Sequence, residues 1–117
     1  MSTDIYQLQQ AFIDFARERD WEQFHSPKNI AMALNVEAGE LMEHFQWLTA
    51  EQSHQLSEDK KREVAHEIAD VSLYLFRLAQ LLNIDIIAAC NEKMDINKQK
   101  YPADKVRGSA KKYKEYD

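Results

Sequence analysis

The sequence predicts an all-α fold from its composition, its apolar spacing and its helix caps. The 117 residues include only two Gly and two Pro, so residues that break helices are scarce. Apolar side chains recur three or four residues apart along most of the chain, which is typical of helices that bury one face. We therefore expect a single four-helix domain over residues 1–102, followed by a charged tail over residues 103–117.

The first helix is expected to begin at a cap formed by Ser2 or Thr3 and to end near Asp20. Its apolar side chains follow helical spacing: Ile5, Leu8, Phe12, Phe15 and Ala16. The connector that follows, residues 21–26, is unusually aromatic for a linker. This composition predicts that the connector either fills the interior or lines a pocket.

The second helix is expected from Pro27 to about Leu48, because Ser26 can cap it and proline is tolerated at the first helical position. Gly39 lies in its interior, where glycine costs about 1 kcal/mol relative to alanine. A close backbone approach or a tight cavity would explain that glycine. Residues 49–57 are polar and are predicted to form a loop.

The third helix is expected from a cap at Ser57 to about Leu82. From residue 68 to residue 82 this helix is apolar on nearly every side. One layer of neighbouring helices cannot cover that much apolar surface. This pattern predicts that the third helix is the central helix of an oligomer.

The fourth helix is expected after a cap at Asp85 and should end near Tyr101, where Pro102 stops it. The remaining tail is mixed and highly charged. It either folds over a neighbour or a polyphosphate, or it is a solvated end.

Composition also bounds the function. The net charge of -5 argues against binding a nucleic acid polymer, which requires many basic contacts with phosphate. No stretch approaches 18 uninterrupted apolar residues and the N-terminus lacks the features of a secretory signal, so no membrane association is expected. The single Cys90 cannot form an internal disulfide, which fits a cytoplasmic protein.

Two pairs of acids, each spaced three residues apart, form a candidate metal site: Glu37 with Glu40, and Glu67 with Asp70. Glu37 and Glu67 fall in the apolar repeats of the second and third helices, so both should point inward. An ionised carboxylate in an apolar interior costs several kcal/mol unless it pairs, protonates or binds a cation. Four hard oxygen ligands on neighbouring helices suit Mg²⁺, with Mn²⁺ as a substitute.

Two alternatives to this metal site stay open. One or two of the acids pair with Arg77 or Lys93 instead. The other alternative is a di-iron carboxylate bundle, because Glu63 and His66 have the Glu-x-x-His spacing of such bundles. A second copy of that motif is missing, since His44 is not spaced three residues after a Glu.

On the fourth helix one face turns from apolar to cationic. Lys93, Asn97 and Lys100 are spaced by four and then three residues, with Tyr101 beside them. Such a row offers ammonium groups, an amide and a hydroxyl to the oxygens of a di- or triphosphate. Taken alone, a solvated basic face is the more common outcome.

These motifs together resemble the MazG-like all-α nucleotide pyrophosphohydrolases. The resemblance rests on E-x-x-E at 37–40, E-x-x-D at 67–70 and K-x-x-x-N-x-x-K-Y at 93–101. It extends over nearly the whole chain and includes the strings at residues 18–25 and 45–47. Within the family the chain is most similar to the members that act on dCTP.

The resemblance implies Mg²⁺-dependent hydrolysis of a deoxynucleoside triphosphate, dCTP or a modified dCTP, to the monophosphate and pyrophosphate. It implies a house-cleaning role in the nucleotide pool and a four-helix fold assembled as a dimer or tetramer. The implied catalytic metal ligands are Glu37, Glu40, Glu67 and Asp70, and the implied phosphate contacts are Lys93, Asn97, Lys100 and Tyr101. A nucleotide-binding sensor or scaffold without turnover is the competing function.

The resemblance also implies a base site. Trp21 and Trp47 match tryptophans that help to enclose the cytosine ring, and His25 lies on the same connector as Trp21. Two residues depart from the family pattern. Lys100 stands where the family usually has arginine, which keeps the charge but loses bidentate geometry. Phe12 stands in place of a base-pocket histidine and can stack on a base without hydrogen-bonding its edge.

Overall fold

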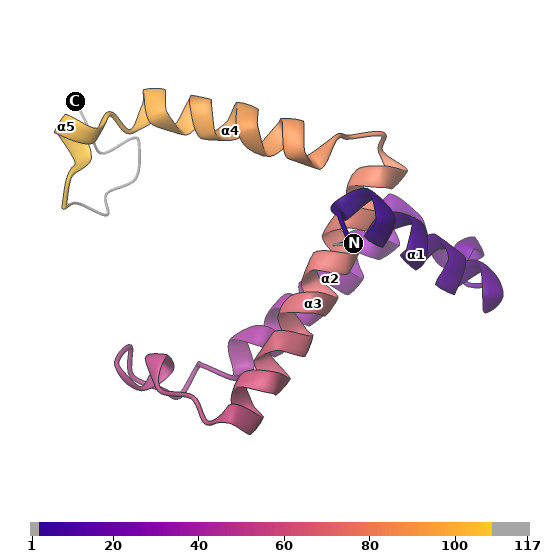
Figure 1. The fold of residues 1–117 in the computed structure, drawn as a ribbon, viewed down its shortest axis with the longest axis horizontal. Coiled ribbons are helices and arrows are strands. Elements are labelled where there is room, and N and C mark those ends of the chain that lie inside the picture. Colours follow the sequence, from indigo (N-terminus) through magenta and orange to yellow (C-terminus); the bar gives the residue numbers. More distant parts are fainter. Residues whose placement is uncertain (1–2, 109–117) are drawn as a thin grey trace. The chain divides into compact units, whose positions relative to one another are not determined.

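The structure is a computed structural model that describes residues 3–108, and no β-strand occurs among them. The four long helices are α1 (Ile5–Glu18), α2 (Pro27–Glu43), α3 (Glu58–Leu81) and α4 (Ile86–Lys100), and a short α5 (Ala103–Val106) follows (Figure 1). Short 3-10 helices cover Glu22–Phe24 and Gln52–His54. The predicted all-α class and the four long helices are therefore confirmed.

Helix α1 begins at a different residue from the one predicted. Its cap is Asp4, whose Oδ1 accepts a hydrogen bond from the Gln7 N–H at 2.8 Å, while the Gln7 Oε1 accepts from the Asp4 N–H at 2.9 Å. This reciprocal box satisfies two amides that the helix leaves unpaired, whereas a hydroxyl cap satisfies one. The prediction of Thr3 as the cap is therefore wrong, and Ser2 lies outside the described residues.

Helix α1 also ends earlier than Asp20. Asp20 has a φ of 55°, in the left-handed region, so the helix cannot continue through it. The Trp21 N–H then donates to the Ala16 carbonyl at 2.8 Å, which turns the chain back at the end of the helix. The connector therefore starts tightly fixed to α1.

Helix α2 begins as predicted and ends early. The Ser26 Oγ accepts a hydrogen bond from the Asn29 N–H at 3.1 Å, and Pro27 is the first helical residue. The helix ends at Glu43, and the chain continues to Leu48 as a series of turns. Apart from the adjoining residues and backbone of its own helix, no described atom lies within 4 Å of where a Gly39 side chain would begin, so neither a close backbone approach nor a tight cavity accounts for that glycine.

The predicted caps of the last two long helices are confirmed. The Ser57 Oγ accepts from the Lys60 N–H at 3.2 Å at the start of α3, and Asn83, with a φ of 56°, follows its end. The Asp85 Oδ1 accepts from the Ala88 N–H at 3.1 Å at the start of α4. The start of the predicted tail forms α5, whereas residues 109–117 lie outside the described part.

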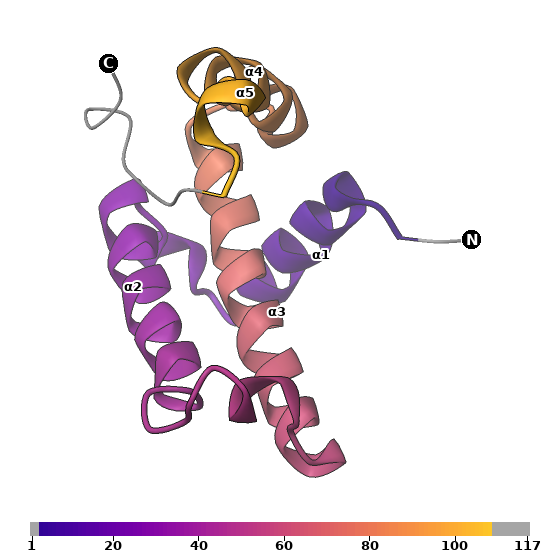
Figure 2. The same ribbon diagram turned by 90° about the vertical axis from the view of Figure 1, so that its left-hand side faces the viewer.

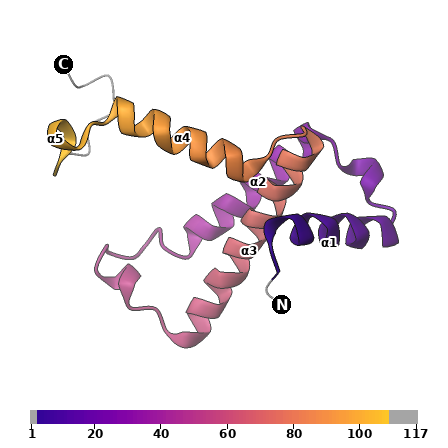
Figure 3. The same ribbon diagram turned by 45° about the horizontal axis from the view of Figure 1, so that its top comes forward.

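The chain forms two compact units, Met1–Asn83 and Ile84–Asp117. Within the first unit α2 and α3 lie side by side as an antiparallel pair, and α1 packs against α3 (Figure 2). Figure 3 shows α1 together with the connector that leads from it to α2. The most buried apolar side chains all belong to this unit: Ile13, Ala16, Ile30, Val64 and Ala79. The division of the chain at residue 102 stays a prediction.

Among the described residues, no single helix is both long enough and apolar enough to cross a membrane. Helices α3 and α4 reach that length and composition only when they are taken together across the break between them.

Candidate functional site

Three of the four predicted metal ligands converge between α2 and α3. One carboxylate oxygen from each of Glu37, Glu67 and Asp70 lies within 4.8 Å of the other two. Residues three apart share one face of a helix, so Glu67 and Asp70 point together from α3 toward the facing α2. We call these three residues the acid cluster.

Glu40 lies one turn after Glu37 on α2 and is exposed. It is not part of the acid cluster, although its carboxylate is close enough to act electrostatically on Glu37. The fourth predicted ligand is thus beside the cluster at the solvent side.

The acid cluster is electrostatically unfavourable as it stands. Burial first, and then the nearby acids Glu40, Glu67 and Asp70, raise the pKa of Glu37 from 4.5 to about 7. The Oε2 atoms of Glu37 and Glu67 are both buried without a hydrogen-bond partner among the described residues. Buried acceptors without partners cost free energy, and a cation would satisfy both of these at once.

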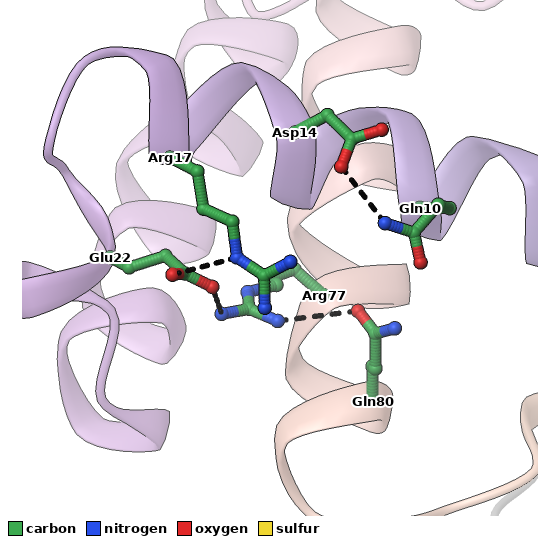
Figure 4. Close-up of polar contacts among 6 residues, drawn as sticks. All are labelled: Gln10, Asp14, Arg17, Glu22, Arg77 and Gln80. Atoms are coloured by element: carbon green, nitrogen blue, oxygen red, sulfur yellow. Dashed lines mark hydrogen bonds and ion pairs between the residues drawn. The ribbon is translucent and has the colours of Figure 1, made fainter.

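Arg77, one alternative partner for these acids, does not pair with them. Its Nη2 lies 3.8 Å from the Glu22 Oε1, and its Nη1 donates to the Gln80 Oε1 at 3.3 Å (Figure 4). The alternative in which Arg77 neutralises the cluster is therefore wrong. The cluster contains carboxylates alone, with neither His44 nor His66 among its ligands, which suits a hard cation.

A pocket of about 500 Å³ adjoins the acid cluster. It is lined by residues from α1, the connector, α2 and α3: Leu8, Ala11, Phe12, Phe15, Trp21, His25, Glu37, Asp70, Leu73 and Tyr74. Glu37 and Asp70 belong to both the pocket and the cluster, so a ligand in the pocket would reach the acids. The volume is in the range that small-molecule sites occupy. Of the two outcomes predicted for the connector, the structure shows that it lines a pocket.

Aromatic contacts build the walls of this pocket. The ring of Phe12 lies 5.6 Å from that of His25 and 5.8 Å from that of Tyr74, and Phe15 lies 5.6 Å from Trp21 in an edge-on contact. Rings at these separations attract one another and resist rearrangement. The walls therefore offer flat apolar surfaces, on which a heterocyclic base could stack.

Two of the residues that line the pocket carry titratable polar groups, His25 and Tyr74. Burial lowers the pKa of His25, nearby Arg77 lowers it further, and Glu22 acts in the opposite direction. A neutral imidazole carries one donor and one acceptor, and its Nδ1 is buried without a hydrogen-bond partner among the described residues. Burial, followed by the charges of Glu37 and Asp70, raises the pKa of Tyr74, so its hydroxyl keeps its proton.

Sequence reasoning missed Tyr74 as a site residue. Tyr74 lies on the same face of α3 as Glu67, and its helical spacing predicted a place in the core. Tyr74 also follows Asp70 by one turn, so its side chain lines the same pocket. Its spacing from Asp70 was the available signal.

The other predicted residues belong to the turns after α2 and to the second unit. Trp47 is 86% exposed and does not line the pocket. Lys93, Asn97 and Lys100 lie on α4 in the second unit, at spacings that place them on one helix face. The Tyr101 N–H donates to the Asn97 carbonyl at 2.8 Å at the end of that helix.

Comparison with known proteins gives a consistent result. Residues 32–116 match the MazG-like family. The chain is 48% identical over 102 residues to a Rattus norvegicus protein named dCTP pyrophosphatase 1. The aligned region covers 86% of this chain and 60% of the relative. It is 46% identical over 104 residues to the Homo sapiens protein of the same name, covering 87% of this chain and 61% of the relative. The chain thus spans about 60% of the length of these curated relatives.

A solved structure also resembles this fold. The crystal structure of a pyrophosphatase from Archaeoglobus fulgidus is 36% identical in sequence and superimposes with a TM-score of 0.79. The match covers 87% of this chain and 95% of that chain.

Proposed function

Because the chain belongs to the MazG-like family, we propose that it hydrolyses a deoxynucleoside triphosphate to the monophosphate and pyrophosphate. The observation that carries this proposal is the junction of the acid cluster with an aromatic pocket through Glu37 and Asp70. A metal site alone or an apolar pocket alone would fit many functions. Their junction supplies one place for a base and one for charged phosphates.

The acid cluster fits the divalent cation that this chemistry requires. Glu37, Glu67 and Asp70 would hold Mg²⁺, with Mn²⁺ as a substitute, and Glu40 would join them from the solvent side. The two buried Oε2 atoms without partners are the observation that supports this fit. When bound there, the cation would draw charge from the phosphate oxygens.

One of the four acids would also orient the attacking water. The pyrophosphate leaving group would be bound by Lys93, Asn97, Lys100 and Tyr101, the cationic face of α4. These phosphate contacts come from the family resemblance and the helical spacing.

The aromatic walls support a base site, and we propose dCTP or a modified dCTP as the substrate. Phe12 and Trp21 provide stacking surfaces, and the imidazole of His25 lines the same pocket, where it can hydrogen-bond a polar edge of the base. The relatives named dCTP pyrophosphatase 1 support cytosine as that base. The proposed role is removal of unwanted nucleotides from the pool, in the cytoplasm and without a nucleic acid polymer as partner.

We propose that the active form is a homodimer or homotetramer. Three apolar side chains on α3 and at its C-terminal cap are exposed by 41–50%: Ile68, Leu75 and Leu82. The large exposed apolar side chains on α2 are Met32, Val36 and Met42. A second copy would cover this surface and could give exposed Trp47 a binding partner. Light scattering at micromolar concentration tests this, and a monomer alone would contradict it.

The direct test of function is pyrophosphate release from a panel of deoxynucleoside triphosphates with Mg²⁺. Wild-type protein should release pyrophosphate most rapidly from dCTP or a 5-substituted dCTP. Asp70→Asn should reduce kcat by at least about 100-fold, since it removes a charge from the metal site. Glu43→Gln, which changes an exposed acid on α2 outside the cluster, is the matched control. Tight binding of dCTP without release of pyrophosphate would instead support the sensor function.

A further inference from the structure

Arg77 is a buried cation whose environment is poor for stability. It is 6% exposed, its Nε has no hydrogen-bond partner among the described residues, and its contacts are Gln80 at 3.3 Å and Glu22 at 3.8 Å (Figure 4). Desolvating a charge costs several kcal/mol, and one long ion pair with one neutral amide does not recover that cost. An apolar side chain would suit this position better, so the stability of the fold does not explain the arginine.

Glu22 joins Arg77 to the connector. Its carboxylate lies between two guanidinium groups, with the Arg17 Nε at 3.0 Å from Oε2 and the Arg77 Nη2 at 3.8 Å from Oε1 (Figure 4). Arg17 belongs to α1 and Arg77 to α3, whereas Glu22 begins the short 3-10 helix of the connector. The connector is thus tied to two helices through one side chain.

The remaining polar contacts hold the connector to α1 and α2. The Trp21 N–H donates to the Ala16 carbonyl at 2.8 Å, and the Asn29 Nδ2 of α2 donates to the Phe24 carbonyl at 3.0 Å. Among the polar contacts given for residues 3–108, the ion pair between Arg77 and Glu22 joins the connector to α3.

This link matters because the two halves of the pocket come from different elements. The connector carries Trp21 and His25, whereas α3 carries Asp70 and Tyr74. Connecting segments move more than the helices that they join, and small misplacements in a binding site lower affinity. A contact between the connector and α3 therefore controls how well the aromatic wall is held against the acids.

We propose that Arg77, acting through Glu22, is a positioning residue that fixes Trp21 and His25 against α3 and thereby sets the affinity for the nucleotide. The statement about affinity rests on the proposed function, whereas the statement about the connector does not. The charge of Arg77 also lowers the pKa of His25, second to burial, which keeps the imidazole neutral toward the pocket.

Steady-state kinetics with dCTP and Mg²⁺ test the role in affinity. Arg77→Met and Glu22→Gln should each raise KM about fivefold, while kcat stays within about twofold, because the metal site is untouched. The double variant should raise KM no more than Glu22→Gln alone, since that change already removes the link to Arg77. Arg77→Lys keeps the charge and should recover part of the affinity. Arg62→Met, an exposed arginine on the same helix, should leave both constants unchanged.

Trp21 fluorescence tests the position of the connector without any substrate. In a Trp47→Phe background Trp21 is the sole tryptophan, because the chain has two. Arg77→Met should increase quenching of Trp21 by iodide at least about twofold, since the pocket side of the ring is no longer held toward α3. Glu22→Gln should do the same and changes a more exposed residue, so it carries the test if Arg77→Met does not fold.

The outcomes are distinct. Unchanged KM and unchanged quenching in Glu22→Gln would overturn the proposal, and so would KM increases that multiply in the double variant. If the wild-type protein hydrolyses no nucleotide, the proposed function fails. The quenching experiment would then still decide whether Arg77 positions the connector.

Discussion

Replacing Glu37 by glutamine should make the metal-free protein more stable at pH 8, although the replaced residue is central to the site. Burial first, and then the neighbouring acids, raise the pKa of Glu37 from 4.5 to about 7. A group whose pKa is higher in the folded state adds stability below its unfolded pKa. That contribution is lost as the pH rises through the folded pKa. Between pH 4.5 and pH 8 the free energy of unfolding of the wild type should therefore fall.

The size of this effect follows from the shift in pKa. Each unit is worth about 1.4 kcal/mol, so a rise from 4.5 to about 7 corresponds to about 3 kcal/mol at pH 8. Glutamine has the shape of the side chain without its titration. Glu37→Gln should thus exceed the wild type by up to about 3 kcal/mol at pH 8, and the advantage should shrink toward zero near pH 4.5.

Urea unfolding in the presence of a chelator, followed by far-ultraviolet circular dichroism at several pH values, measures this difference. Comparing variant with wild type at each pH cancels the contributions of titrating groups that do not interact with Glu37. Glu43→Gln is the control, because it removes an acid from the exposed part of the same helix. Addition of Mg²⁺ should then stabilise the wild type and stabilise Glu37→Gln much less, since a bound cation favours the folded state.

Two results would refute this reasoning. In the first, Glu37→Gln is less stable than the wild type at pH 8 without metal, which would mean that the carboxylate is well solvated or paired. In the second, the difference between the two proteins is the same at pH 4.5 and pH 8, which would mean that the charge of Glu37 is not its cause.

Three further predictions concern other parts of the first unit. Asp4→Ala removes the capping box of α1 and should lower the free energy of unfolding by about 1 kcal/mol in urea titrations, whereas Thr3→Ala should not. Because the pKa of His25 is lowered, wild-type stability should fall as the pH drops below 6.5; His25→Gln should lose less between pH 7 and pH 5, and an equal loss would contradict this. Phe12→Ala should raise the Kd for dCTP at least about tenfold in calorimetry and leave Mg²⁺ binding unchanged, and weaker Mg²⁺ binding would contradict the separation of the two halves.

Several local features could be read from the sequence because they depend on neighbouring residues. The caps at Ser26, Ser57 and Asp85 form as predicted, since each needs only a short polar side chain and an amide three residues later. The predicted start of α1 and the predicted end of α2 were wrong, and the reasons are equally local. The reciprocal bond between Asp4 and Gln7 displaced the hydroxyl cap, and turns replaced the last part of the expected second helix, which ends at Glu43.

In the candidate site, too, the features that depend on one helix could be predicted, whereas those that depend on helix packing could not. Helical spacing alone placed Glu67 and Asp70 on one face and placed Glu37 on an apolar face, so the three members of the acid cluster could be predicted from the sequence. Spacing could not show that Glu40 is exposed beside the acid cluster, because that depends on how α2 is rotated against α3.

The sequence by itself therefore determined the helical class, most of the caps and the inward acids, all of which follow from contacts within one helix. Only the tertiary structure decided which residues share a pocket. It brought Phe12, Tyr74 and His25 together from three elements, and it directed Arg77 to Glu22 instead of to the acids. The physical reason is that such contacts depend on the packing of one helix against another, and helical periodicity carries no information about that packing.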